Sequence, residues 1–154
     1  MSQFDPQAFL DSTTTEASIK RPPLPIGDYT ALITKVEARE WVSKKADAKK
    51  TSGLAFDLTL QVEVPHSIRE QINLDGPTLT LPYGVLVDTT PQGSIDYGVG
   101  KNGALRKVRE ATGLNEAGQP FSPRMFEGKV VLAKVGHREY QGDIYDEVTA
   151  IAKA

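Results

Sequence analysis

The chain has 154 residues, an ordinary share of charged and apolar side chains, a formal net charge of −2 and no cysteine. This length fits one domain. The lack of cysteine excludes disulfides and thiol chemistry and fits a reducing cytosol. No run of about 18 apolar residues is present, so no membrane span is expected, and the first residues lack the pattern of a secretory signal. Because the net charge is slightly negative, any nucleic-acid site must be a local patch of cations.

Residues 1–24 are predicted to form an arm, and residues 25–154 to form the domain. Asp5 followed by Pro6 predicts the start of a short helix, and the proline-rich segment 20–25 predicts a stiff, extended spacer. Two interpretations of the arm stay open. It is a frayed terminus, or it contacts a partner or a second copy of the chain. The second interpretation uses three apolar side chains, Phe4, Phe9 and Leu10.

Two long strands are predicted next, over residues 27–39 and 54–64. The second alternates apolar and polar side chains without a break, which indicates one buried and one wet face. The first changes phase, and we expect a bulge near Ile33 to reconcile its two halves. The segment between the strands, residues 41–53, joins an aromatic side chain, Trp41, to a cluster of lysines.

A short irregular or helical connection over residues 66–72 leads to a third strand over residues 79–87. Pro82 has no N–H to donate to a neighbouring strand, so this strand is expected at a sheet edge or with a bulge. A helix is then predicted from Asn102, its N-cap, to Gly113, its C-terminal glycine.

The last two strands are predicted over residues 129–136 and 144–152, joined by a turn at residues 139–143. The chain is therefore expected to be mainly β with one helix, in the order β-β-β-α-β-β. This is the order of the OB fold, a five-stranded Greek-key barrel. A small open sheet covered by one helix would contain the same elements.

No enzyme signature is visible. The segment from Gly98 to Lys101 suggests a phosphate-binding loop, but Ile95 and Asn102 stand where that loop needs glycine and a hydroxyl residue. With two histidines and no cysteine, a zinc site would need scattered carboxylates. We therefore expect a non-catalytic protein without metal or cofactor.

The remaining pattern is one of basic residues interleaved with aromatic ones. Single-stranded nucleic acid needs this mixture, because cations follow the phosphates and flat rings stack the bases. In an OB fold, the loop between the first two strands and the loop between the last two flank the binding face. The expected phosphate contacts are Arg39, Lys44, Lys45, Lys49, Lys50 and Arg138. The expected stacking residues are Trp41, Tyr83 and Tyr140, although core packing of Trp41 stays an equal alternative. Arg106 and Arg109, on the predicted helix, are second-rank candidates.

Several motifs resemble those of small proteins from tailed bacteriophages. They are Phe4-Asp5-Pro6-Gln7-Ala8-Phe9-Leu10, Pro25-Ile26-Gly27-Asp28-Tyr29-Thr30-Ala31, Lys35-Val36-Glu37-Ala38-Arg39-Glu40-Trp41, Gly98-Val99-Gly100-Lys101-Asn102, Leu105-Arg106-Lys107-Val108-Arg109-Glu110-Ala111 and Val135-Gly136-His137-Arg138. The family that they indicate is that of the OB-fold single-stranded DNA-binding proteins of these phages. The resemblance implies phage origin, the host cytoplasm as location, and a role in DNA replication or recombination.

Two functional hypotheses follow. The first is a sequence-tolerant single-stranded DNA-binding protein whose partners are single-stranded DNA, replication or recombination proteins and, through the arm, a second copy of the chain. The alternative is a non-catalytic protein-interaction or virion component that uses the barrel as a scaffold and the arm as its contact. The nearly neutral charge favours the alternative, whereas the paired basic and aromatic loops favour DNA.

Overall fold

The structure, a computed structural model, describes residues 4–42 and 52–154. In this part of the chain, the strands are β1 (Gly27–Val42), β2 (Ser52–Glu63), β3 (Thr78–Val87), β4 (Val130–Tyr140) and β5 (Asp143–Lys153). The helices are α1 (Pro6–Asp11), α2 (His66–Ile72), α3 (Gly103–Ala111) and a 3₁₀ turn, η1 (Pro123–Phe126). The mainly β prediction is confirmed. Helix α3 lies where the one longer helix was predicted, and α1 and α2 form where the sequence allowed short helices, whereas η1 was not predicted.

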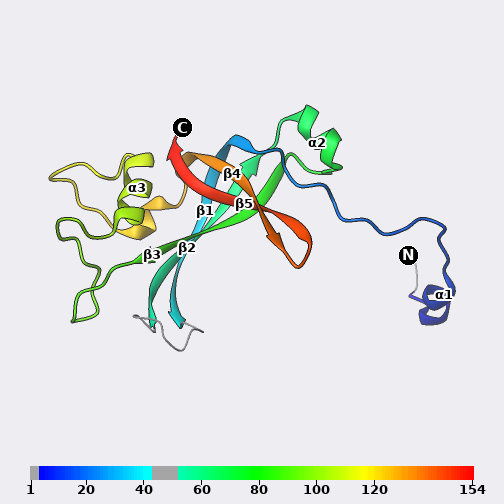
Figure 1. The fold of residues 1–154 in the computed structure, drawn as a ribbon, viewed down its shortest axis with the longest axis horizontal. Helices are drawn as coiled ribbons and strands as arrows, with labels where there is room; N and C mark the ends of the chain where they lie inside the picture. Colours follow the sequence, from blue (N-terminus) through cyan, green and yellow to red (C-terminus); the bar gives the residue numbers. More distant parts are fainter. Residues whose placement is uncertain (1–3, 43–51) are drawn as a thin grey trace.

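The five strands form one antiparallel sheet in the order β3-β2-β1-β4-β5. The sheet curls into a barrel-like shape, so that its two edge strands, β3 and β5, come close together (Figure 1). The described residues form no ladder between these two strands. The predicted edge position of β3 is confirmed. Because no described strand pairs with the free side of β3, the missing N–H of Pro82 removes no hydrogen bond there.

The curl of β1 depends on the bulge that its sequence predicts. The register between β1 and β2 shifts between Ile33 and Lys35, which leaves Thr34 unpaired. Ile33 stays paired with Leu60 of β2 and also bonds the segment before β4: its N–H donates to the Lys129 carbonyl at 2.9 Å, and its carbonyl accepts the Gly128 N–H at 2.8 Å. A bulge bends a strand and increases its twist, which allows one long strand to pair with β2 and β4.

The core fills the inside of the curled sheet. The inward side chains of β2, which are Phe56, Leu58, Leu60 and Val62, are buried, as their alternation predicts. Helix α3 contributes Leu105, Val108 and Ala111 on one stripe and contacts β3 and β5. Asn102 occupies the N-cap position of α3, but its side chain bonds Asp88 and Asp96 rather than the helix.

The arm divides into two parts. Helix α1 lies away from the sheet at the end of an extended chain (Figure 1), and its side chains are exposed. Leu24, by contrast, is fully buried in the core. We therefore include the proline-rich segment, residues 20–25, in the packed domain, whereas the sequence placed the start of the domain between residues 24 and 25.

Candidate functional site

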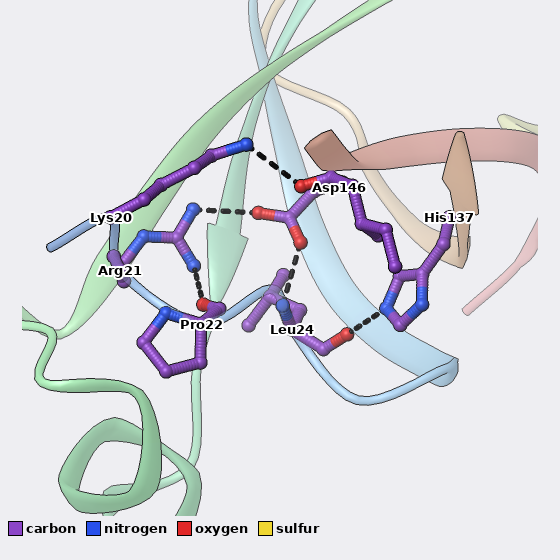
Figure 2. Close-up of polar contacts among 7 residues, drawn as sticks. Lys20, Arg21, Pro22, Leu24, His137 and Asp146 are labelled. Atoms are coloured by element: carbon purple, nitrogen blue, oxygen red, sulfur yellow. Dashed lines mark hydrogen bonds and ion pairs between the residues drawn. The ribbon is translucent and has the colours of Figure 1, made fainter. Parts of the chain in front are cut away.

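Residues Lys20–Pro25, which we call the strap, bind the last two strands. Arg21 Nη2 donates to Asp146 Oδ2 at 2.7 Å, and the Leu24 N–H donates to Asp146 Oδ1 at 2.6 Å. His137 Nε2 lies 2.6 Å from the Leu24 carbonyl oxygen, which requires the proton to be on Nε2. Figure 2 shows these contacts converging from the strap and from both strands of the hairpin. The strap therefore fixes the β4–β5 hairpin relative to the core.

The strap also completes a basic and aromatic surface on the hairpin. Lys20 Nζ donates to the Ile144 carbonyl at 2.8 Å and lies 3.4 Å above the centre of the Tyr145 ring. Tyr145 is paired directly across the hairpin with Arg138. Tyr140 is two residues from Arg138, so the two share a face of β4, and it is 59% exposed. We call Lys20, Arg138, Tyr140 and Tyr145 the hairpin patch.

A cleft of about 520 Å³ lies between the hairpin and β3. Tyr83 and Arg138, which are far apart in the sequence, both line it. Tyr83 is half-buried and packs against the core, and burial raises the pKa of its hydroxyl. Two acidic residues, Asp146 and Glu147, also line the cleft, but the carboxylate of Asp146 is already paired with Arg21.

Trp41 lies on the outer face of the sheet, on the side that it shares with Arg39. It is half-buried, and Gly53, its partner across the β1–β2 pair, lies directly beneath the indole. Among the described residues, Trp41 Nε1 is buried without a hydrogen-bond partner. The ring therefore packs against backbone rather than in the main core, and its stacking of bases stays a prediction.

Replacing Gly53 with valine should displace the indole, because a Cβ atom at Gly53 would lie 2.7 Å from three atoms of the Trp41 ring. Since Trp41 is the only tryptophan in the chain, its fluorescence reports this change directly. We expect the emission to shift to longer wavelengths and the free energy of unfolding to change by no more than about 1 kcal/mol. Gly27→Val is the control, because a Cβ there meets nothing within 4 Å. Unchanged emission in the Gly53 variant would contradict this packing.

Arg39 already has a partner. Its Nε and Nη2 donate to the two carboxylate oxygens of Asp57 at 2.7 and 3.3 Å. The hydrogen bond and charge of Asp57 raise the pKa of Arg39. Both side chains are about half exposed, so an incoming phosphate would have to compete with this carboxylate.

The second-rank candidates differ from each other. Arg106 is exposed and lies 3.5 Å from Glu110, one helical turn away. Arg109 is half-buried, donates through Nε to the Leu114 carbonyl at 3.0 Å and lies 4.2 Å from the centre of the Phe121 ring. Arg109 therefore holds the segment after α3 in place. The predicted contacts Lys44, Lys45, Lys49 and Lys50 lie outside the described residues.

Lys20 was missed as a member of the candidate site. Tyr145 belongs to the predicted pattern of basic and aromatic residues, but it was not among the expected stacking residues, because packing of its ring in the core was an open alternative. Lys20 stood in the predicted spacer, and no local pattern indicates that it meets a strand more than 120 residues later. The apolar arm residues Phe4, Phe9 and Leu10 are all exposed.

Comparison of the chain with models of protein families gave no match, and comparison with curated proteins also gave none. In the described part of the chain, no helix is both long enough and apolar enough to cross a membrane.

Proposed function

We propose that the barrel-like domain is an OB fold. Two features support this assignment. The strand order β3-β2-β1-β4-β5 brings the edge strands β3 and β5 together, as closure of a five-stranded Greek-key barrel requires. In addition, α3 stands between β3 and β4, and a bulge bends the long first strand.

We further propose that the protein binds single-stranded DNA without sequence preference and without catalysis. The observation that carries this proposal is the hairpin patch, where Arg138 and Lys20 flank exposed rings, next to the cleft that Arg138 lines together with Tyr83 of β3. In single-stranded DNA both the phosphates and the bases are accessible, so cations can bind the phosphates while neighbouring aromatic rings stack the bases. The resemblance to phage proteins supports a role in phage DNA replication or recombination, in the host cytoplasm and with proteins of those processes as partners.

Arg138→Ala tests this function. If Arg138 contacts a phosphate, the variant should bind a labelled oligothymidylate more weakly, and the slope of log affinity against log salt should fall by about 0.7. The measurement is fluorescence anisotropy at several salt concentrations, with a duplex of equal length for comparison. Arg124→Ala is the control, since Arg124 is an exposed cation on η1 that belongs neither to the hairpin patch nor to the lining of its cleft. If the wild type fails to bind the oligonucleotide, the proposed function is wrong.

One observation favours the alternative of a protein-interaction or virion component. The rings of Phe4 and Phe9 lie 5.0 Å apart in the arm, and both are exposed together with Leu10. Such an apolar cluster on a short helix suits contact with a partner or with a second copy of the chain. Light scattering on the full chain and on a Phe4→Ser, Phe9→Ser variant would show whether these residues support self-association.

A further inference from the structure

A second basic cavity lies at the start of α3, on the opposite side of the molecule from the β4–β5 hairpin (Figure 1). Its volume is about 290 Å³. Among the described residues that line it, Lys101, Arg106 and Arg109 carry positive charge, and none carries a carboxylate. The cavity therefore presents a concentrated positive charge on a chain whose net charge is negative.

An exposed aromatic ring borders these cations. Tyr97 is 54% exposed and contacts the ring of Phe121 edge to face, with the ring centres 6.4 Å apart. The guanidinium of Arg109 lies 5.8 Å from the centre of the Tyr97 ring and 4.2 Å from that of Phe121. These contacts support one side of Tyr97 and leave much of it open to solvent.

The loop that carries Tyr97 and Lys101 is fixed by a buried amide. Asn102 accepts the Asp88 N–H through Oδ1 at 2.7 Å, and its Nδ2 donates to the carbonyls of Asp88 and Asp96 at 3.0 and 2.7 Å. The loop is thus tied to the end of β3 before any ligand arrives. Preorganisation of this kind lowers the entropy lost on binding.

The carboxylates near the cavity leave its cations available. Asp96 accepts the Gly98 N–H at 2.9 Å, and Glu110 lies 3.5 Å from Arg106 in an exposed pair. An exposed pair of this kind contributes little to stability, so a phosphate with several acceptor oxygens can displace Glu110.

We propose that this cavity, the α3 pocket, is a second contact site for single-stranded DNA, in which Lys101 and Arg106 bind a backbone phosphate and Tyr97 stacks a base. This inference rests on the proposed function and extends it. Arg109 is a positioning residue that supports Tyr97. Because the α3 pocket and the hairpin patch lie on opposite sides of the molecule, a single DNA strand can contact both sites only if it is long.

The test compares the double variant Lys101→Ala, Arg106→Ala with a control of equal charge, Lys107→Ala, Lys153→Ala. The control removes two cations from a different cleft between α3 and β5. Two labelled oligothymidylates are used, one near the lower and one beyond the upper end of the roughly 4–16 nucleotides that an OB fold covers. The melting temperatures of both variants are measured to show that they are folded.

For the long oligonucleotide, we expect the double variant to bind about tenfold more weakly at low salt. Its salt slope should fall by about 0.7 for each phosphate that the variant no longer neutralises. The short oligonucleotide should bind the variant as it binds the wild type, and Tyr97→Leu should weaken only the binding of the long one. If the wild type binds neither oligonucleotide, the proposed function fails and this inference with it. If the wild type binds while the double variant matches the control, only the α3 pocket is refuted.

Discussion

Removal of residues 1–24 should lower the free energy of unfolding by about 5 kcal/mol or more, whereas removal of residues 1–19 should leave it nearly unchanged. The longer deletion takes away Leu24, whose full burial predicts a loss of about 2–5 kcal/mol for truncation to alanine alone. It also leaves the Asp146 carboxylate without its partners, and breaking a buried charge pair typically costs about 3–5 kcal/mol. Of the residues that the shorter deletion removes, those that the structure describes, residues 4–19, are all exposed.

Urea denaturation of the two truncated proteins measures this difference. Because total stabilities of about 5–15 kcal/mol are usual, the longer deletion can prevent folding altogether. Leu24→Ala in the full chain then provides a milder measurement, with Ile19→Ala as the control at a position that is 82% exposed. Equal stability of the two truncated proteins would show that the strap is not part of the folded domain.

Asp146→Ala should lower the free energy of unfolding by about 3 kcal/mol. The side chain of Asp146 is 4% exposed and accepts hydrogen bonds from Arg21 and from the Leu24 N–H. We expect the lower end of the range for a broken buried pair, because the Arg21 side chain is 31% exposed and water can solvate part of its charge. Thermal or urea unfolding gives the magnitude.

Two further variants identify the cause. Asp146→Asn keeps an oxygen that can accept the Leu24 N–H, so its loss of stability should be smaller. Asp143→Ala removes an exposed carboxylate at the start of β5 and should change stability by about 0.5 kcal/mol or less.

Trypsin should cleave after Lys20 faster in Asp146→Ala than in the wild type, because the strap is released. Equal losses in the Asp143 and Asp146 variants would contradict the role of the strap.

The strap connects stability to the candidate site. The same segment that places Leu24 in the core also places Lys20 above Tyr145 on the hairpin patch. A protein without the strap would therefore lose both a core side chain and one of the cations proposed to meet DNA. The two truncated proteins can be compared for oligonucleotide binding only if the longer deletion still folds.

Local patterns in the sequence were sufficient to predict five strands and their order along the chain, but not where they end: β1 continues to Val42 and β4 to Tyr140, beyond the predicted ends at residues 39 and 136. The unbroken alternation of β2 identified its buried face, because side chains of a strand point alternately to opposite sides. The phase change in β1 predicted the bulge that the register shift confirms. The hairpin turn follows from Gln141 and Gly142, which both adopt positive φ, as a tight two-residue turn between twisted strands requires.

Only the tertiary structure decided which distant residues meet. The curl of the sheet brings Tyr83 on β3 to the same cleft as Arg138 on β4. The strap lies against β5 and pairs Arg21 with Asp146. A periodic pattern reports whether one segment has a buried face, but it carries no information on which other segment covers that face. The sequence of this protein therefore determined its elements and their order along the chain, whereas the curl of the sheet and the course of the strap across the hairpin determined which distant residues meet.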